Sequence, residues 1–377
     1  MTILENKMNI LVNGYNLRQT STGIANVIIN AVNSLVSKSN INIELVVSPI
    51  ISNEIKSRLS DKIKLTVIGT QNSFKWLMWY FPGYAKHAEY DYLWSPTPLL
   101  PRKTFKKNKN VIITVHDFVS KDFRQTMTLK GRLITSLLEK NTIKKADYLW
   151  CVSNYTKAKL EEYYPTRKCK KIFVGSSPDC NIRTVKLNED EKYSFFEQYN
   201  ICKNYLLFVG SLEPRKNLSF LLSVFEDYHK KHKDMQLVIV GARKWGNSNL
   251  ADIINSPEFP KEDVIFTPFI NEYDLMTLYS YASCYISTSL NEGYGLPQAE
   301  AMLCGCPVIT AHNSAMIEVV ENAGITVEGW DTEVWVDAIE DALSRRQDII
   351  KQQNIKTKDF NWDILINNLI EYLTNKS

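Results

Sequence analysis

Two glutamates that flank a glycine-rich loop are the first candidates for chemistry in this chain. Glu292 and Glu300 stand eight positions apart in the stretch NEGYGLPQAEAMLCGC, residues 291–306. The apolar run 284–290 is typical of a buried strand, and the stretch 297–305 opens on proline and closes on glycine, as a helix does. A strand, a glycine loop and a helix start direct backbone N–H groups and the positive end of a helix dipole to one point, which favours an anion.

A pair of cations follows another predicted strand, 204–212. The stretch GSLEPRKN begins at Gly210 and places Arg215 and Lys216 just before a predicted helix, 217–232. Cations at a helix start oppose the helix dipole, so the pair needs another reason to be there. A diphosphate supplies that reason, because arginine offers a planar fork and lysine a point charge. The alternative is a basic helix start without a ligand.

A carboxylate beside a phosphate site needs a role that outweighs its repulsion of the phosphate. Hydrogen bonding to the neutral hydroxyls of a ribose or a hexose gives Glu292 and Glu300 such a role. The alternative is one glutamate that caps the helix and one that is merely exposed. In the first half of the chain, His116 ends a predicted strand, 110–117, where a histidine is a poor core residue. Its alternative is a core histidine with satisfied hydrogen bonds.

Strand-like apolar runs alternate with helical stretches in both halves, which predicts parallel sheets covered by helices. At 377 residues, two domains are expected. We expect an N-terminal domain at 1–187, a C-terminal domain at 188–357 and a final helix at 358–377 that returns to the first domain, with the charged stretch 182–195 as the connection. Ligands bind at the carboxyl ends of strands in such folds. Neither half has a G-x-G-x-x-G after its first strand, which argues against a dinucleotide oxidoreductase.

Composition indicates a cytosolic globular protein. No run of about 18 apolar residues predicts a membrane span, and the N-terminus lacks the features of a secretory signal. The seven cysteines are scattered, which fits a reducing compartment. The charge is divided unevenly, since residues 1–187 carry 29 Lys and Arg against 13 Asp and Glu, and the remainder carries 16 against 28. A basic N-terminal half favours an anionic partner such as a membrane or nucleic acid. The alternative is that the two solvated surfaces came to differ in charge without any functional reason.

Together these stretches resemble the retaining GT-B glycosyltransferases of family 4. LNEGYGLPQAEAMLCGCPVI is similar to the E-x7-E block of that group, and FVGSLEPRKNL is similar to its phosphate-binding block. TVHDF, CVSNYTKAKL, FTPFINEYDLMTLYSYA and FNWDILINNLIEYL match further segments in the same order, so the resemblance covers nearly the whole chain. It implies an α/β fold of the GT-B type, with two Rossmann-like parallel-sheet domains facing a cleft. It also implies a nucleoside-diphosphate sugar as donor substrate, with no cofactor and no metal.

The resemblance implies a role for each candidate residue. Glu292 would bind hydroxyls of the donor sugar and Glu300 the ribose. Arg215 and Lys216 would hold the diphosphate and stabilise its charge as it leaves. His116 would contact the sugar or its reacting centre. Further substrate contacts are implied for Gly23, from the first domain, and for Gly210, Gly293, Tyr294, Gly295 and Leu296 in the second.

Two departures from the family pattern leave the donor identity open. Ser211 stands where many members have arginine, and GIANV at 23–27 replaces the commoner GIGRY. The implied reaction is sugar transfer with retention at the anomeric carbon. No second carboxylate faces His116 that could serve as a nucleophile, so same-face substitution is favoured. In that reaction the leaving phosphate takes the proton of the acceptor hydroxyl. The alternatives are a GT-B sugar-nucleotide epimerase and a binding module without turnover.

The predicted acceptor is a glycan or a polyprenol-linked glycan, met at an anionic membrane surface. The stretch PRKTFKKNKN, 101–110, is rich in cations, and SFKWLMWYFPGY, 73–84, is rich in aromatic residues. Aromatic and basic side chains together suit the headgroup region of a bilayer. We therefore expect a cytoplasmic protein that is peripheral on the inner face of the cell membrane. Nucleic acid is not expected as a partner, because no recognition motif accompanies the charge.

Overall fold

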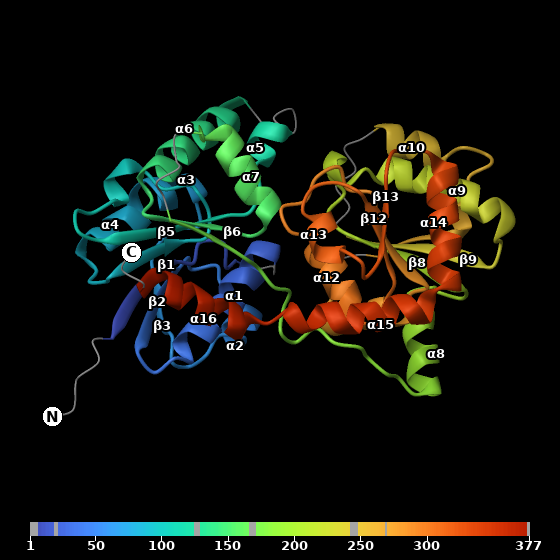
Figure 1. The fold of residues 1–377 in the computed structure, drawn as a ribbon, viewed down its shortest axis with the longest axis horizontal. Coiled ribbons are helices and arrows are strands. Elements are labelled where there is room, and N and C mark those ends of the chain that lie inside the picture. The colour runs from blue at the N-terminus through green and yellow to red at the C-terminus, as the bar shows by residue number, and fades with distance from the viewer. Residues whose placement is uncertain are drawn as a thin grey trace. The chain divides into compact units, whose positions relative to one another are not determined.

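The chain folds into two units, each an α/β domain around one parallel sheet (Figure 1). The structure is a computed structural model that describes residues 7–18, 22–123, 129–165, 171–241, 248–267 and 270–374. The first unit comprises Met1–Cys180 together with Asn361–Ser377, and the second comprises Asn181–Phe360.

The first unit holds a seven-stranded sheet in the order β3-β2-β1-β4-β5-β6-β7, with every described pair parallel. Its strands are β1 (Met8–Asn13), β2 (Ile41–Val47), β3 (Lys64–Val67), β4 (Tyr92–Ser95), β5 (Asn110–Val115), β6 (Tyr148–Cys151) and β7 (Lys171–Val174). Its helices are α1 (Gly23–Val36), α2 (Asn53–Ser57), α3 (Ser73–Lys75), α4 (Phe81–His87), α5 (Val119–Asp122), α6 (Leu129–Lys145), α7 (Asn154–Tyr163) and α16 (Trp362–Thr374). A short π-helical segment, Trp76–Tyr80, joins α3 to α4.

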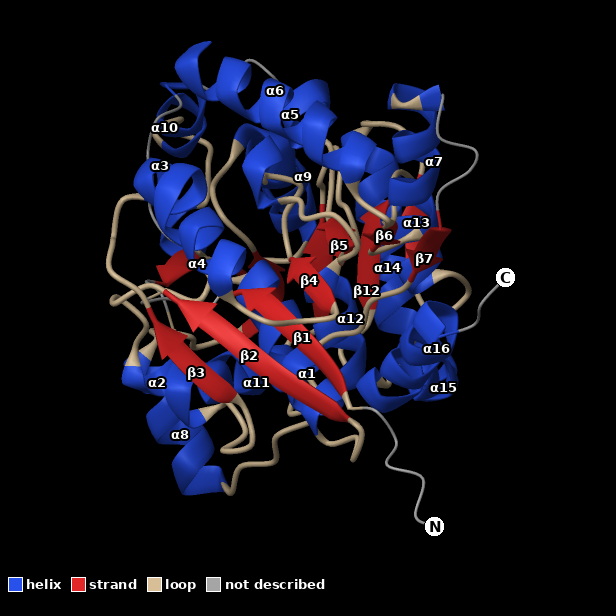
Figure 2. Ribbon diagram, turned by 90° about the vertical axis from the view of Figure 1, so that its left-hand side faces the viewer, coloured by secondary structure: helices blue, strands red, loops and turns tan. Residues whose placement is uncertain are grey.

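The order of strands in this sheet reverses at β1. The chain runs from β1 outward to β2 and β3, which lie side by side with it in Figure 2, and then returns to place β4 on the other side of β1. The crevice outside the carboxyl ends of the strands at such a switch point is where open α/β sheets bind ligands. A ligand-binding site is therefore expected in the first unit at the carboxyl ends of β1 and β4.

Helices cover both faces of the first sheet. Alternate strand residues face opposite sides, so each strand contributes to two cores. On one side α1 and α16 pack over the sheet, with Trp362 against Trp150 at 6.4 Å between ring centroids. On the other side Phe81 of α4 and Ile143 of α6 belong to the second core. The last helix of the chain is thus part of the first unit's interior.

The second unit holds a six-stranded parallel sheet in the order β10-β9-β8-β11-β12-β13. Its strands are β8 (Asn204–Val209), β9 (Met235–Val240), β10 (Val264–Thr267), β11 (Cys284–Ser287), β12 (Val308–Ala311) and β13 (Ile325–Val327). Its helices are α8 (Glu189–Gln198), α9 (Leu218–Lys231), α10 (Ser248–Ile254), α11 (Glu272–Tyr281), α12 (Leu296–Leu303), α13 (Met316–Val320), α14 (Thr332–Ser344) and α15 (Arg346–Lys356). Helices α9 and α14 pack side by side over one face (Figure 1), and α11 and α12 contribute to the core on the other.

Two local expectations from the sequence differ from the structure. The stretch 182–195, read as a connector, contains the start of α8, because Asn188 and Glu191 form a reciprocal capping box that begins a helix at Glu189. The strand predicted at 204–212 ends at Val209. Residues 268–269, within one of the quoted family-like segments, lie outside the described residues. None of the helices that the structure describes is long and apolar enough to cross a bilayer.

Candidate active site

The candidate site lies at the carboxyl edge of the second sheet, where the strand order reverses. Strand β8 pairs with β9 on one side and with β11 on the other, so the switch point falls between β8 and β11. Gly210 follows β8, and the loop 288–295 follows β11. The two stretches singled out in the sequence therefore leave neighbouring strands at the edge where such folds bind ligands.

The loop after β8 is locked to the loop after β11 by hydrogen bonds. Pro214–Lys216 form one 3-10 turn, and Asn217 adopts a left-handed conformation, φ 53°, before α9 begins. The Thr288 hydroxyl lies 3.1 Å from both the Lys216 and the Asn217 carbonyl oxygens. The Leu290 amide donates to the Arg215 carbonyl at 2.7 Å. The backbone that carries the two cations is thereby fixed against β11.

Glu292 joins both cations in one buried cluster. Its Oε2 accepts from Arg215 Nη1 at 3.0 Å, and its Oε1 accepts from Lys216 Nζ. The Ser289 hydroxyl donates to the same Oε1 at 2.8 Å. Glu292 is 8% exposed and Lys216 is 7% exposed, so the contacts are largely shielded from solvent. The structure thus brings together three of the residues predicted from sequence, across more than seventy positions of chain.

The electrostatics of this cluster keep Glu292 ionised. Burial alone raises the pKa of a carboxyl group, but the charges of Lys216 and Arg215 and the hydrogen bonds from Lys216 and Ser289 outweigh it and lower the pKa of Glu292. Arg215 also pairs through Nε with the exposed carboxylate of Glu213 at 2.9 Å. Two cations at fixed positions at a sheet edge can receive a diphosphate without first having to be ordered.

The glycine loop leads into α12 through a left-handed residue. Gly295 has φ 105° and precedes Leu296, the first residue of the helix, and Pro297 stands in the first turn, where its missing N–H is not needed. Burial raises the pKa of the neighbouring Tyr294 phenol. At the start of the loop, the Glu292 amide donates to the Ser314 hydroxyl at 3.0 Å.

Glu300 has a different environment from Glu292. It lies on the buried side of α12, 9% exposed, and its Oε2 accepts from the Tyr279 hydroxyl of α11 at 3.3 Å. Burial, and then the charge of Glu300, raise the pKa of Tyr279 well above its usual value. The two glutamates of the stretch 291–306 therefore have separate partners. Glu292 contacts the two cations of the turn, and Glu300 contacts the buried phenol of Tyr279.

The remaining predicted site residues belong to the first unit. His116 directly follows β5, and its Nε2 lies 2.9 Å from the Pro96 carbonyl oxygen. Burial, opposed by the charge of Asp117 and the bond to Pro96, lowers the pKa of His116. A carbonyl only accepts, so Nε2 carries the proton in this contact and Nδ1 is the acceptor nitrogen. Gly23 begins α1, where the Thr22 hydroxyl accepts from the Ala25 amide at 3.2 Å.

Two contributors to the site were missed in the sequence. Gly241 follows β9, and a Cβ there would lie 2.1 Å from the Gly210 carbonyl oxygen, so only glycine permits this approach of the two strand ends. Asn313 donates through Nδ2 to the Ser289 carbonyl at 3.1 Å and so supports the loop. A glycine directly after a buried strand was the available signal for Gly241. Nothing in the sequence pairs residue 313 with residue 289.

Cationic side chains are the groups in this site that suit a diphosphate. Within the described residues, no three His, Cys, Asp or Glu side chains group together as a metal site would require. The carboxylates nearest the turn, Glu213 and Glu292, are both engaged by Arg215.

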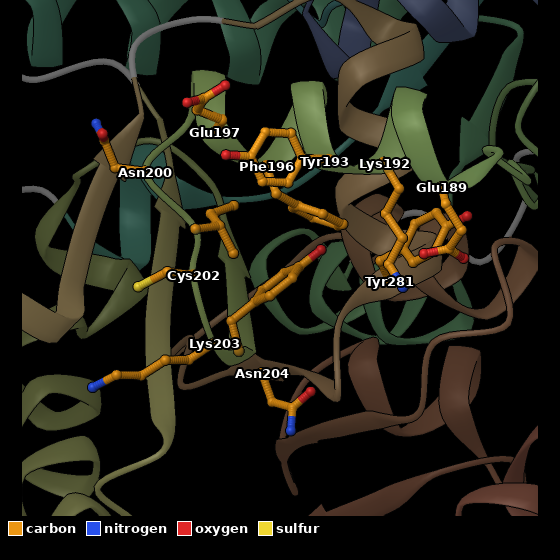
Figure 3. Close-up of a pocket in the computed structure, with 12 residues that line it drawn as sticks. Glu189, Lys192, Tyr193, Phe196, Glu197, Asn200, Cys202, Lys203, Asn204 and Tyr281 are labelled. Atoms are coloured by element: carbon orange, nitrogen blue, oxygen red, sulfur yellow. The ribbon is translucent and has the colours of Figure 1, made fainter.

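A separate pocket opens at the other end of β8. This cavity of about 810 Å³ is lined by residues of α8, of the loop into β8 and by Tyr281 of α11. Figure 3 shows Lys192, Tyr193 and Phe196 of α8 among the side chains around it. None of the predicted site residues lines this pocket, which adjoins Asn204 at the amino end of the strand.

Two Rossmann-like domains with parallel sheets, and a cationic turn at the switch point of the second, define an α/β protein of the GT-B type. The fold class predicted from the sequence is confirmed by this topology and by solved structures of the same fold. HepE from Anabaena, in complex with UDP-glucose, aligns over 97% of this chain and 99% of its own with a TM-score of 0.75 at 16% identity.

Sequence comparisons agree with this class. Residues 189–361 match the family described as "Glycosyl transferases group 1". The chain is 25% identical over 230 residues to O-antigen chain mannosyltransferase B of Escherichia coli, which covers 59% of this chain and 59% of that protein, less than two thirds of its length. It is 27% identical over 266 residues to O-antigen chain mannosyltransferase RfbU of Salmonella typhimurium, 67% of this chain and 69% of that one. These matches support the prediction of a glycosyltransferase.

Proposed function

We propose that this protein is a retaining, metal-independent glycosyltransferase of cell-surface polysaccharide synthesis, in lipopolysaccharide or capsule. It moves a hexose from a GDP- or UDP-sugar to a glycan or polyprenol-linked acceptor. The observation that carries the proposal is the buried cluster of Arg215, Lys216 and Glu292 at the switch point of the second sheet. Two relatives are named mannosyltransferases, which makes mannose the first candidate sugar.

The cluster has the charge arrangement that donor cleavage requires. When the bond between the anomeric carbon and the diphosphate oxygen breaks, negative charge grows on the leaving diphosphate. Arg215 and Lys216, already held in place by Glu292, stabilise that charge. An oxygen of the leaving phosphate accepts the proton of the acceptor hydroxyl as that hydroxyl bonds to the same face of the sugar. The loop from Gly293 to Leu296 and the Glu300 carboxylate contribute contacts to the sugar, the phosphates and the ribose.

His116 assists as a hydrogen-bond acceptor rather than as a cation. Its lowered pKa keeps the imidazole neutral near pH 7, and the contact with Pro96 leaves Nδ1 as the nitrogen with a lone pair. A sugar hydroxyl can donate to that nitrogen. Gly23 contributes backbone without a side chain, which allows a phosphate to approach the start of α1.

Turnover of nucleotide sugars tests the proposal. The purified protein is incubated with GDP-mannose, UDP-glucose and related donors and with glycan acceptors, and the released nucleoside diphosphate is measured. Arg215→Ala or Lys216→Ala lowers turnover by about 100-fold, the usual scale for one preorganised donor. Lys230→Ala, which removes an exposed cation at the far end of α9, leaves it unchanged.

Three outcomes of this assay separate the alternatives. Loss of activity in EDTA with recovery on adding magnesium or manganese contradicts the metal-independent mechanism. Conversion of the sugar nucleotide without any acceptor favours an epimerase. Binding of a nucleotide sugar with no turnover under any condition favours a binding module.

A basic and aromatic surface on the first unit supports the membrane part of the proposal. Phe74, Trp79 and Tyr80 are 45%, 54% and 43% exposed. Trp79 and Tyr80 lie in the π-helical segment, and both this segment and the 3-10 turn Arg102–Thr104 pack against α4. Lys103 is exposed on that turn. Tryptophan and tyrosine with cations suit the headgroup region of an anionic membrane, and each cation contributes about 1 kcal/mol there.

Not every lysine of the stretch 101–110 is available to such a surface. Lys106 donates to the Ala88 carbonyl at 3.0 Å, and Lys106 and Lys109 lie over the Tyr90 ring at 4.9 and 5.7 Å. Lys107 is exposed, as Lys103 is. The cations proposed to meet the membrane are therefore Lys103 and Lys107, with Arg102 beside them.

Vesicle co-sedimentation tests the docking surface. Binding requires anionic lipid, falls as salt rises, and weakens in Lys103→Gln/Lys107→Gln and in Trp79→Ala. The matched control Lys56→Gln/Lys62→Gln removes two exposed cations elsewhere on the first unit and leaves binding unchanged. Equal binding to neutral vesicles, or none to anionic vesicles at low salt, points instead to an acceptor met in solution.

A further inference from the structure

The carboxyl edge of the first sheet carries a cluster that the donor chemistry does not use. Asn13 ends β1 and Ser95 ends β4, and Asn13 Nδ2 donates to the Ser95 hydroxyl at 3.4 Å. The Trp76 indole donates to Asn13 Oδ1 at 3.0 Å, and the Tyr15 amide donates to the same oxygen at 3.3 Å. These contacts fix Tyr15 and Trp76, whose rings lie 5.4 Å apart, at the switch point between β1 and β4.

An arginine completes this cluster. Arg18 lies with its guanidinium carbon 4.6 Å from the centre of the Tyr15 ring. Its Nη2 donates to the Gln71 carbonyl at 2.8 Å, which holds the guanidinium in one orientation. Arginine stays charged at any pH a protein tolerates, so a permanent cation stands at this edge. Among the described residues, no carboxylate forms an ion pair with Arg18.

Two donors of this cluster are buried without a partner. The Arg18 Nε and the Tyr15 hydroxyl oxygen are both shielded from solvent, and neither has a hydrogen-bond partner in the described part of the chain. A buried donor left unpaired is destabilising, more so where it is charged, so such groups are seldom left without a function. The two donors belong to residues in contact with one another, since the Arg18 guanidinium lies over the Tyr15 ring. Each of them can donate a hydrogen bond to an oxygen atom of a ligand.

We propose that Arg18 and Tyr15 form an anion subsite that binds a phosphate or carboxylate oxygen of the acceptor substrate. The guanidinium supplies charge and a directed N–H, and the phenol supplies an O–H, the combination that recognises an anionic oxygen. The site lies at the edge where an open parallel sheet binds ligands. The assignment to the acceptor rests on the proposed function, whereas the anion site itself rests on the geometry of the first unit alone.

The neighbouring surface favours an anion that is attached to an apolar chain. Trp76, against which Tyr15 packs, lies in the same π-helical segment as the exposed Trp79 and Tyr80. An anionic head at Arg18 would then stand beside aromatic rings that suit lipid. A free phosphorylated or acidic sugar has the same head without the chain, so the two sources differ in affinity rather than in the contact with Arg18.

Calorimetric titration with inorganic pyrophosphate tests the subsite. The parent protein is Arg215→Ala/Lys216→Ala/Glu292→Gln, so that the donor cluster of the second unit adds no second anion site and no buried carboxylate is left without its cations. Adding Arg18→Gln weakens binding by about tenfold or more, the scale of one charged hydrogen bond. Adding Tyr15→Phe keeps the ring contact with Trp76, removes only the hydroxyl, and weakens binding several-fold. Adding Lys56→Gln, an exposed cation of the same unit, leaves binding unchanged.

A second arm distinguishes the source of the anion. The same proteins are titrated with a short-chain polyprenyl diphosphate in detergent micelles. Binding that is at least tenfold tighter than that of pyrophosphate, and equally sensitive to Arg18→Gln, identifies a lipid-linked anion, whereas equal affinity identifies a soluble one. Binding that is insensitive to Arg18→Gln in both arms overturns the subsite. Nucleotide-sugar binding by the single variant Arg18→Gln stays at the wild-type level, and a failure of donor turnover in wild-type protein counts against the proposed function without affecting the titrations.

Discussion

At the scale of single residues, Glu292 presents a problem of charge. It is a buried carboxylate in a site that is proposed to receive a diphosphate, and like charges repel. Its contacts with Arg215 and Lys216 resolve this, because the single buried carboxylate is outweighed by the two cations that it holds in place. Removing one partner of such a buried set is costly, since the others are left without compensation.

The ionisation of Glu292 makes the stability of the second unit depend on pH. The pKa of this group is lowered from 4.5 in the fold, so its contribution is fully present above pH 4.5 and is lost as the pH falls through the lower, folded value. Glu292→Gln destabilises the second unit near pH 7 by about 3–5 kcal/mol. The difference in unfolding free energy between this variant and the wild-type protein then becomes smaller below pH 4.5. Urea unfolding across pH 3–7 measures this.

Glu258→Gln is the matched control, because Glu258 is exposed in a loop of the same unit. Its stability curve runs parallel to that of wild type. If the curve of Glu292→Gln is also parallel down to pH 3, folding does not lower the pKa of Glu292.

Part of the candidate cluster could be predicted from the sequence, but the contacts that its residues make could not. Arg215, Lys216 and Glu292 were predicted from residue type and position after a strand, and the structure joins them. Glu300 was predicted to bind a ribose, and its hydrogen bond with Tyr279 could not be predicted from the sequence. The partner of a side chain depends on which strands are neighbours, and spacing along the chain does not encode that.

At the scale of elements, the cationic turn, Pro214–Lys216, depends on how closely the carboxyl ends of β8 and β9 approach one another. The Gly210 amide donates to the Val240 carbonyl at 2.9 Å, and the next residue, Gly241, stands against the Gly210 carbonyl. The two strand ends can lie this close because residue 241 carries no side chain.

Gly241→Ala is therefore expected to disturb this edge far more than Gly210→Ala. The added Cβ at residue 241 would lie 2.1 Å from a backbone oxygen, which cannot turn aside, whereas at residue 210 the nearest atoms are side-chain carbons of Lys216 and Phe208 at 3.5 Å. Overpacking of this kind costs about 1–3 kcal/mol or more, and an ordinary contact less than about 1 kcal/mol. Urea unfolding of the second unit measures both variants. Equal losses would mean that the strand ends are not in close contact.

The alternation of strands and helices was predicted from apolar periodicity, and the structure has it in both units. The start of α8 was missed because Asn188 and Glu191 were read as part of a charged connector rather than as a capping box. The order of strands in each sheet was not predicted at all. It follows from how helices pack across the faces, which depends on side chains that are distant in sequence.

At the scale of the whole molecule, the two units are not two successive halves of the chain. Residues Asn361–Ser377 belong to the first unit, and their helix α16 supplies Trp362, Ile366, Leu369 and Leu373 to its core. Helix α16 therefore stabilises the sheet to which β1 belongs. A stability measurement on the first unit has to include both of these elements.

Trp362→Ala is expected to lower the stability of the first unit only, so that the two units unfold in separate thermal transitions. The Trp362 ring packs against Trp150, and its indole donates to the Pro178 carbonyl at 2.8 Å within the first unit. Removing a buried tryptophan costs about 3–5 kcal/mol, so the first unit is expected to unfold at lower temperature, while the second is expected to keep the nucleotide binding proposed for it. Ile364→Ala, on the same helix but 55% exposed, shifts neither transition. Differential scanning calorimetry with and without nucleoside diphosphate resolves this, because the ligand raises only the transition of the unit that binds it. A single transition lowered for both units by Trp362→Ala would show that the two fold as one cooperative body.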